Sequence, residues 1–234
     1  MCRISAHLFF FGDDFLYRTE SLFDLTKSMA GDYLKRFEYP WMALSGIKEL
    51  IINIGNELDK KDFDEILPFV WVHKSAIIAP SAFIGAPCII NDESEVRHGA
   101  FIRGAALVGR GCVIGNSVEV KNAILFDKVQ VPHYNYVGDS ILGYKSHMGA
   151  GAITSNVKSD KSLVTVNYNG MKIKTRLKKF GAILGDCVEV GCNCVLNPGT
   201  VVCSNSNIYP LSCVRGVVPS GSIYKSGGII VPKI

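Results

Sequence analysis

A six-residue repeat of large apolar side chains dominates the middle of this 234-residue chain. In steps of six from Val72, every position as far as Phe126 carries a large apolar side chain. A second column, four residues after the first eight of these, is held mostly small: Ala76, Ala82, Cys88, Ser94, Ala100, Ala106, Cys112 and Val118. Neither the period of a helix nor that of an ordinary strand gives this pattern. It predicts a solenoid, whose units stack around one continuous apolar core.

The same phase returns over residues 184–214, and the register slips between the two blocks, around residues 132–143. Three hexapeptides predict a triangular coil, whose short strands pair in parallel with those of the next coil about 4.8 Å away. This pattern resembles the left-handed parallel β-helix of hexapeptide-repeat proteins, and the handedness rests on that resemblance. We therefore expect an all-β fold with a small N-terminal helical segment and an extruded hairpin arm.

Residues 1–70 stand outside the repeat and are richer in charged and aromatic residues. Their pattern predicts a helix over residues 22–37 and a second helix, opened by Pro40, near residues 41–58. An open first coil exposes unpaired strand edges. We therefore expect this segment to cap that coil, as a small N-terminal domain.

The solenoid domain is expected over residues 71–234, interrupted by an inserted arm over residues 154–180. Within the arm, Asn169-Gly170 separates two runs of alternating residues, which is a strong signal for a β-hairpin with a type I′ turn. The arm carries five closely spaced cations, Lys172, Lys174, Arg176, Lys178 and Lys179. Two interpretations stay open: an arm that covers the site of a neighbouring subunit, and a solvated, charged loop.

The composition argues against a nucleic-acid-binding protein, a membrane span and a zinc site. The formal net charge is +4, with acidic residues spread along the chain, so no basic stripe points to nucleic acid. No apolar run reaches the roughly 18 to 20 residues of a membrane span, which favours a cytoplasmic protein. There the eight cysteines are expected to be reduced. The cluster Cys187, Cys192 and Cys194 lacks the paired spacing of a zinc site, so no metal is expected.

Two cations occupy equivalent places in successive coils. Arg103 and Lys121 both follow the apolar column directly and are separated by one predicted coil. Stacked at strand spacing, they repel each other unless an anion lies between them, and a phosphate or carboxylate is the natural counter-ion. The alternative is that Glu119 and neighbouring carboxylates already neutralise the pair.

His133 is the histidine that the pattern singles out. It lies in Pro132-His133-Tyr134-Asn135-Tyr136, where the hexapeptide register breaks. A break in an otherwise regular repeat is expected where local regularity gives way to function.

The stretch from Ile114 to Thr154 includes the element His133-x-x-Tyr136-x-Gly-Asp. Along this stretch the chain resembles, without gaps, the acetyltransferase half of the bifunctional bacterial enzyme that makes UDP-N-acetylglucosamine. Residues 179–186 are similar to archaeal and clostridial relatives that carry a longer arm before this motif. The resemblance covers roughly residues 72–220.

The resemblance implies transfer of an acetyl group from acetyl-CoA to the amine of an amino-sugar phosphate, such as glucosamine-1-phosphate. It further implies a homotrimer with sites between subunits. Carried over, His133 matches the general base, and Arg103 and Lys121 match the phosphate-binding cations. Tyr136 matches a tyrosine that holds the sugar phosphate, and Glu119 a carboxylate that lines the same pocket.

On the acetyl-CoA side, the resemblance points to Gly149, Ala150, Gly151 and Cys192. Ala150 matches a segment that approaches the thioester, and the glycines allow close approach of the backbone. An attacking amine must lose a proton, and a neutral imidazole is suited to accept it at neutral pH. Backbone N–H groups would then stabilise the negative charge that develops on the thioester oxygen.

The chain also departs from the family pattern. His147 stands where the family has an asparagine that contacts the sugar, so it is assigned to the substrate pocket with a changed chemistry. The family's basic residue in the arm has three candidates here, Lys172, Lys174 and Lys179. Nothing in residues 1–70 resembles a glycine-rich nucleotide-binding opening, so no nucleotidyltransferase activity is expected.

Two rival functions use the same solenoid. Trimeric carbonic anhydrases hold zinc with three histidines, but His133 and His147 are too far apart in the sequence to form the close histidine pair of such a site. The other rival is a non-catalytic module for assembly or for binding a sugar nucleotide. Within the enzyme hypothesis, galactosamine-1-phosphate and a nucleotide-linked amino sugar also remain open as acceptors.

Overall fold

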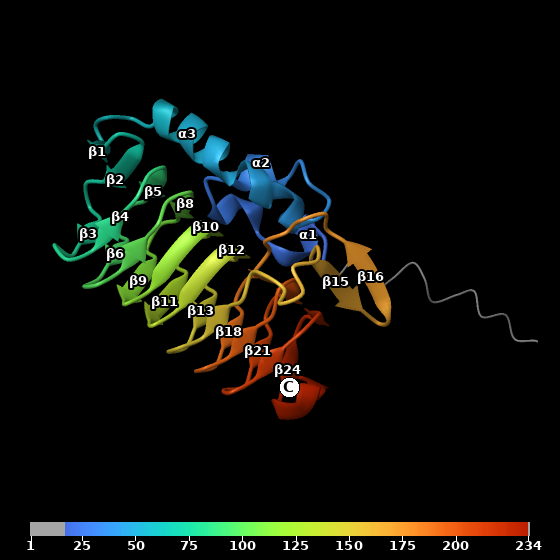
Figure 1. Cartoon of the computed structure of the whole chain (residues 1–234). Coiled ribbons are helices and arrows are strands. Elements are labelled where there is room, and N and C mark those ends of the chain that lie inside the picture. The colour runs from blue at the N-terminus through green and yellow to red at the C-terminus, as the bar shows by residue number, and fades with distance from the viewer. Residues whose placement is uncertain (1–16, 234) are drawn as a thin grey trace, which may run out of the picture.

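The computed structural model describes residues 17–233 and contains a triangular solenoid of short strands. One sheet of 14 strands and one of nine wrap around a common core (Figure 1). All pairings along the solenoid are parallel; the antiparallel pairs are β1–β2 and β24–β25 at its ends and the hairpin β15–β16. The predicted fold class, a left-handed parallel β-helix of hexapeptide repeats, is confirmed.

Each coil contributes one strand to each of three faces. What we call the site face holds β4 (Phe83–Ile84), β7 (Phe101–Ile102), β10 (Glu119–Leu125), β12 (Tyr136–Leu142), β14 (Ile153–Thr154), β19 (Val195–Leu196) and β22 (Cys213–Val214). Because β10 and β12 continue across a corner, this face joins the next in one sheet. That second face holds β1 (Phe63–Leu67), β2 (Val70–His73), β5 (Cys88–Ile90), β8 (Ala106–Val108), β17 (Ala182–Leu184), β20 (Thr200–Val202) and β23 (Val217–Val218).

The third face is the nine-stranded sheet. Its strands are β3 (Ile77–Ile78), β6 (Glu95–Val96), β9 (Val113–Asn116), β11 (Gln130–His133), β13 (His147–Met148), β18 (Glu189–Val190), β21 (Asn207–Ile208), β24 (Ser222–Tyr224) and β25 (Ile230–Pro232). A 3₁₀ turn, η3 (Ser226–Gly228), connects the last two.

The two predicted columns form the core. Ile102, Ile114 and Val120 from the large column are fully buried, as is Cys112 from the small column. Burial raises the pKa of the Cys88 and Cys112 thiols to about 12, so they stay protonated. Neither of them forms a disulfide, and both serve as packing residues.

The register slips earlier than predicted. Successive coils first pair in steps of three full hexapeptides, as in Val120 with Ile102, but Ala123 already pairs with Ala106, a step that is one residue shorter. Asn122 lies between the two pairs with a positive φ of 46°. Asparagine is one of the few residues that enter this left-handed region readily, and there it shortens the corner by one residue.

The prediction of one helix over residues 22–37 is wrong. The structure has only short pieces here: α1 (Thr19–Leu22), η1 (Leu25–Lys27) and α2 (Gly31–Leu34). The Asp24 side chain accepts a hydrogen bond from the Thr26 backbone N–H, a local turn that competes with a continuous helix. The second helix forms close to the expected place, as η2 (Pro40–Gly46) and α3 (Ile47–Glu57). None of the helices within residues 17–233 is long and apolar enough to span a membrane.

Most of this N-terminal segment lies along the second face, where α3 covers β5, β8 and β10 (Figure 1), and only its last strand, β1, covers the first coil. The Leu22 carbonyl accepts a hydrogen bond from Ser204 Oγ at 2.9 Å, and the Leu44 carbonyl accepts one from Asn122 Nδ2 at 3.2 Å. The antiparallel strand β1 covers the edge of β2 in the first coil. The apolar side of α3 is buried on the sheet, which explains the different placement.

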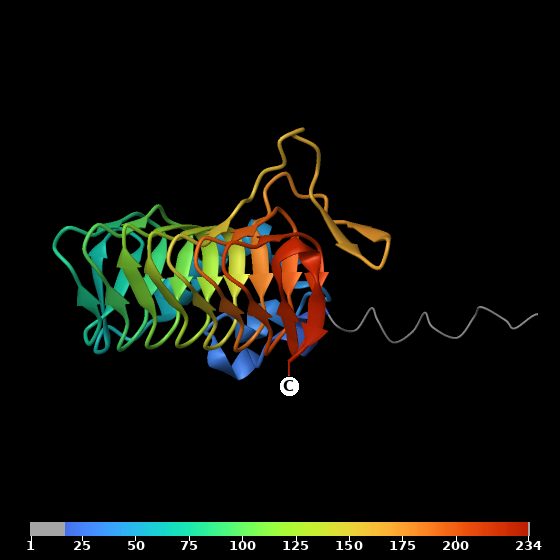
Figure 2. The same ribbon diagram turned by 90° about the horizontal axis from the view of Figure 1, so that it is seen from below.

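The arm forms the predicted hairpin from β15 (Thr165–Tyr168) and β16 (Met171–Lys174). Asn169 and Gly170 have φ values of 47° and 81°, positive at both positions as a type I′ turn requires. Figure 2 shows the arm extending beyond the outline of the solenoid. Val164 and Val166 on its underside are fully buried, so the hairpin is packed at its base.

Candidate functional site

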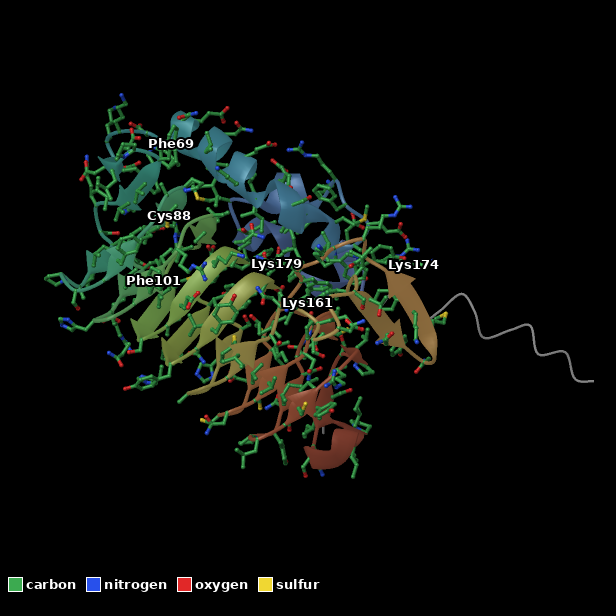
Figure 3. The ribbon with its side chains drawn as sticks, in the orientation of Figure 1. Phe69, Cys88, Phe101, Lys161, Lys174 and Lys179 are labelled. Atoms are coloured by element: carbon green, nitrogen blue, oxygen red, sulfur yellow. The ribbon has the colours of Figure 1, made fainter. Side chains whose placement is uncertain are left out.

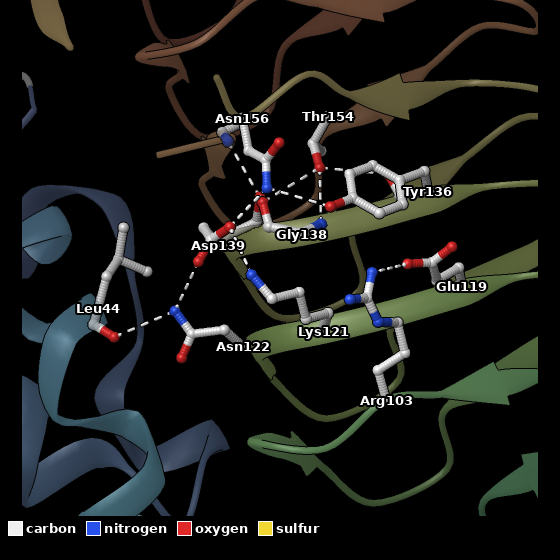
Figure 4. Close-up of polar contacts among 12 residues, drawn as sticks. Leu44, Arg103, Glu119, Lys121, Asn122, Tyr136, Gly138, Asp139, Thr154 and Asn156 are labelled. Atoms are coloured by element: carbon white, nitrogen blue, oxygen red, sulfur yellow. Dashed lines mark hydrogen bonds and ion pairs between the residues drawn. The ribbon is translucent and has the colours of Figure 1, made fainter. Parts of the chain in front are cut away.

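A polar cluster lies on the site face where β10 and β12 run side by side (Figure 4). We use this name for eight residues: Arg103, Glu119, Lys121, Asn122, Tyr136, Asp139, Thr154 and Asn156. Side chains at alternate positions of a strand share one face. This alternation places Glu119 and Lys121 of β10 on the same side. The structure therefore brings together four residues that the sequence analysis assigned to the sugar phosphate.

Arg103 is paired with a carboxylate. Its Nη1 lies 2.7 Å from Glu119 Oε1, and the hydrogen bond to Glu119 raises the pKa of the guanidinium. Nearly half of the Arg103 side chain is exposed, at 46%. A guanidinium has five N–H donors, so donors remain for a ligand while Glu119 fixes the orientation.

Lys121 is held by a buried carboxylate that sequence reasoning did not assign. Its Nζ lies 3.3 Å from Asp139 Oδ2, and Asp139 is only 5% exposed. The same carboxylate accepts hydrogen bonds from Asn122 Nδ2 at 2.9 Å and from Asn156 Nδ2 at 2.5 Å. A signal for Asp139 was present, because it lies one further predicted coil beyond Lys121 and ends the His-x-x-Tyr-x-Gly-Asp element.

Tyr136 presents a phenol that stays protonated. Its oxygen accepts a hydrogen bond from Asn156 Nδ2 at 3.0 Å, which leaves the O–H proton available to a ligand. Burial raises the pKa of Tyr136, and the negative charges of Asp139 and Glu119 raise it further. Two cations and one neutral donor therefore line the same strip of the site face.

His133 lies at the corner between the third face and the site face. It ends β11, and β12 begins three residues later with Tyr136. The ring is exposed, and within residues 17–233 it has no hydrogen-bond partner. Its position leaves the imidazole open to solvent and to a ligand.

Ala150 and Cys192 follow at the same corner in the next two coils. The His133 carbonyl accepts a hydrogen bond from the Gly151 N–H at 3.1 Å. The Gly149 N–H donates to Val190, so both glycine donors are used within the solenoid. In the part of the chain that the structure describes, the Ala150 N–H has no such backbone partner. Ala150 is therefore the best placed of the three backbone donors to meet a ligand.

His147 is separated from the phosphate-binding candidates. It lies on the third face, with Nδ1 2.8 Å from Glu189 Oε2, in a shallow depression shared with Lys128, Gln130 and Lys145. Within one chain, the structure does not bring His147 to Arg103 and Lys121. Strand phase decides this, because His147 pairs with Gln130 on β11 instead of with a strand of the site face.

No metal centre is assembled among residues 17–233, since no three histidine, cysteine, aspartate or glutamate side chains come together there. In the cysteine cluster, Cys194 Sγ instead donates to the Tyr209 carbonyl at 3.1 Å.

Comparison with known proteins places this geometry in a family. Residues 84–218, more than half of the chain, match the family model described as the GMPPB C-terminal domain. The chain belongs to this family. The match spans the polar cluster, His133 and the arm.

Curated relatives agree with the resemblance to the bifunctional enzyme. The chain is 32% identical over 205 residues to the "Bifunctional protein GlmU" of Methanococcus maripaludis, covering 86% of this chain and 49% of that protein. It is 32% identical over 105 residues, 45% of this chain, to 26% of the "Bifunctional sugar-1-phosphate nucleotidylyltransferase/acetyltransferase" of Sulfurisphaera tokodaii. The chain thus spans about half the length of the first relative and about a quarter of the second.

Solved structures give a weaker likeness. The perosamine N-acetyltransferase of Caulobacter crescentus, in complex with CoA and GDP-perosamine, is 15% identical, with a TM-score of 0.33 over 68% of this chain and 55% of that one. The acetyltransferase domain of PglB from Neisseria gonorrhoeae, in complex with acetyl coenzyme A, is 16% identical, with a TM-score of 0.32 over 82% of this chain and 67% of that one. At these values the likeness says nothing about individual site residues.

Proposed function

We propose that the protein is an acetyltransferase that uses acetyl-CoA to N-acetylate an amino-sugar phosphate, with glucosamine-1-phosphate as the first acceptor to test. The observation that carries the proposal is the polar cluster, in which two carboxylate-held cations and a protonated phenol lie one corner away from an open histidine. The names of the relatives that share this half of the chain support the same chemistry.

The cluster is suited to a phosphate group. Arg103 and Lys121 occupy adjacent coils, at about the 4.8 Å spacing of paired strands, so one phosphate can bridge them. Tyr136 adds a neutral O–H donor beside them. The ion pairs with Glu119 and Asp139 fix the positions of the two cations, and so fix where the phosphate binds.

The reaction needs one base and one oxyanion donor. The sugar amine attacks the thioester carbonyl carbon, an N–C bond forms, and the His133 imidazole takes the amine proton. The Ala150 N–H stabilises the negative oxygen of the tetrahedral intermediate. When this collapses, the C–S bond breaks, and the thiolate of coenzyme A leaves with the proton returned by the imidazolium. No covalent enzyme intermediate and no metal is required.

The site is completed by further copies of the chain in this proposal. His133 opens outward at a corner, and the polar cluster lies on a flat sheet face, so a ligand between them is covered on one side only. A homotrimer with sites between subunits supplies the second wall. His147 and Glu189, on another face, would then reach the site of a neighbouring subunit.

The test is incubation of the purified protein with acetyl-CoA and a panel of amino-sugar phosphates, with N-acetylated product measured by mass spectrometry. We expect product with at least one acceptor, and a decrease of about 100-fold or more in kcat/KM for His133→Ala. The matched control is His98→Ala, which removes an exposed histidine two coils away at the same corner. This control should keep full activity.

Two results would count against the enzyme. If no acceptor is acetylated, but one of them raises the melting temperature, the protein is a non-catalytic sugar-binding module. If His98→Ala lowers activity as much as His133→Ala, the loss reflects damage to the corner and His133 is not the base. The mass of the product separates sugar phosphates from nucleotide-linked sugars, and separate incubations distinguish glucosamine-1-phosphate from galactosamine-1-phosphate, whose products have equal mass.

A further inference from the structure

The arm concentrates the positive charge of the chain. Residues 155–179 contain seven lysines and arginines and one aspartate, a net charge of +6, whereas the whole chain carries +4. The remainder of the chain is therefore net negative, at −2. The net positive charge of this short insertion is therefore larger than that of the whole chain.

The cations on the hairpin side of the arm are exposed and lack carboxylate partners. Within residues 17–233, Lys172, Lys174 and Arg176 form no ion pair, whereas Lys158 lies 3.4 Å from Asp160. Lys172 and Lys174 alternate with the partly buried Met171 and Ile173, so they share the outward side of β16, and Arg176 follows two residues after the strand with a positive φ of 61°. Lys172 and Lys174 are about 6.8 Å apart along the strand, and a row of like charges at this distance is most stable with an anion beside it.

Packing holds this row outward. Val164 and Val166 are fully buried beneath the hairpin, and the Tyr168 ring lies 5.9 Å from the Tyr17 ring of the N-terminal segment. Figure 3 shows Lys174 on the hairpin and Lys179 nearer the body of the protein. The apolar underside prevents the hairpin from turning its cations inward.

Both ends of the arm are attached to the polar cluster. At the start, Thr154 Oγ1 accepts a hydrogen bond from the Gly138 N–H at 2.9 Å. At the end, the Gly181 N–H donates to the Asp139 carbonyl at 2.8 Å. The arm is thus anchored beside the candidate site, and the hairpin with its row of cations lies at the far end of the arm (Figure 2). A ligand with a small reactive end at the cluster would have its remote, anionic end near the hairpin.

We propose that Lys172, Lys174 and Arg176 bind the phosphate groups of the acyl donor, the pyrophosphate and the 3′-phosphate in the nucleotide half of coenzyme A. The inference rests on the proposed function and extends it to a second phosphate site, distinct from Arg103 and Lys121. The row has only three cations, so it fits a ligand with a few phosphate groups close together. The positive charge ends with the arm, so a long polyanion such as RNA would continue onto a body of net negative charge.

The test is calorimetric titration of coenzyme A and 3′-dephospho-coenzyme A into the full chain. For the triple variant Lys172→Gln, Lys174→Gln, Arg176→Gln, we expect the Kd for coenzyme A to rise about tenfold, since each exposed charge contact contributes modestly. Loss of the 3′-phosphate should weaken binding to the wild type and have little effect on the variant. The control Lys48→Gln, Lys60→Gln, Lys61→Gln removes the same charge from exposed positions elsewhere and should bind like the wild type.

Equal Kd values for the wild type and the arm variant would overturn the inference. So would tighter binding of a single-stranded oligonucleotide than of coenzyme A, which assigns the arm to nucleic acid. The proposed function fails separately, if the wild type binds no coenzyme A at all. Since the three side chains are exposed, unchanged melting temperatures are expected and exclude misfolding as the cause.

Discussion

The molecule contains two groups of cations that differ in how they are held. On the solenoid, Arg103 and Lys121 each face a carboxylate, and that carboxylate is itself hydrogen-bonded or oriented by the sheet. On the arm, Lys172, Lys174 and Arg176 have no ion-pair partner among the residues that the structure describes. The first group has fixed positions and partly cancelled charge. The second consists of exposed side chains whose positive charge is not neutralised by ion pairs within the described residues.

This difference implies two kinds of recognition. A charge fixed by a neighbour makes short, directional hydrogen bonds and discriminates between ligands by geometry. Free, exposed charges attract any compact anion, and salt screens them over about 8 Å at physiological ionic strength. We therefore expect the sheet to select the acceptor, and the arm to contribute attraction for the donor.

The largest effect is expected where a fixed cation loses its buried partner. Asp139 is only 5% exposed, and Asp139→Ala removes the acceptor of Lys121 and of two asparagine amides. We expect the free energy of unfolding to fall by about 3 kcal/mol, measured by urea denaturation. The control Glu95→Ala breaks the exposed Glu95–Arg97 pair and should cost less than about 1 kcal/mol. Equal losses for the two variants would show that burial of Asp139 adds nothing to the strength of its ion pair.

Salt should separate the two groups in binding and kinetics. For Arg103→Gln we expect kcat/KM for the sugar phosphate to fall by about 100-fold, as a charge-assisted pair is lost. The defect should persist at about 0.5 M NaCl, because the contact is short and partly shielded. The donor affinity of the wild type, in contrast, should approach that of the triple arm variant as salt increases. Defects that shrink alike with salt would show that both groups act only by long-range attraction.

The neutral donor on the sheet gives a prediction about pH. Because the pKa of Tyr136 is raised, its phenol stays protonated throughout about pH 6 to 9 and loses its proton only under more alkaline conditions. We expect Tyr136→Phe to raise KM for the sugar phosphate about tenfold, by the same factor across this range. Steady-state kinetics at several pH values provide the measurement. A wild-type advantage that disappears between pH 7 and 9 would contradict a protonated phenol.

The smallest effect concerns the exposed partner of Arg103. Glu119→Gln should leave the free energy of unfolding nearly unchanged, because nearly half of the Arg103 side chain is in solvent. It should nevertheless raise KM for the sugar phosphate about threefold, since the guanidinium loses its orientation. A lower KM would show that Glu119 competes with the phosphate instead of positioning Arg103.

The repeat made the solenoid predictable, because a six-residue period leaves few other folds and fixes which side chains point inward. The same arithmetic places Arg103 and Lys121 in adjacent coils, which the pairing of Val120 with Ile102 confirms. The hairpin turn was also predictable, since Asn169-Gly170 favours positive φ at both positions.

Features that depend on distant contacts were not predictable. The helix expected over residues 22–37 is interrupted at Asp24, whose backbone N–H donates to Asp186 Oδ2 of a distant coil at 2.6 Å, and the segment packs along a face that only the folded solenoid provides. Asp139 gained its importance from Asn122 and Asn156, which approach it only once the coils are stacked. His147 could be assigned to a face only when its strand phase was known.

The N-terminal segment has a consequence for how the protein unfolds. In a stack of repeats each unit contacts only its neighbours, so the ends fray and opening spreads one unit at a time. Here the segment bonds Ser204 through Leu22, Asp127 through Lys27 and Asn122 through Leu44. When the coil of Ser204 opens, it loses its contact with a segment that also binds coils in the middle of the stack. We therefore expect the coils that the segment joins to unfold together instead of one at a time.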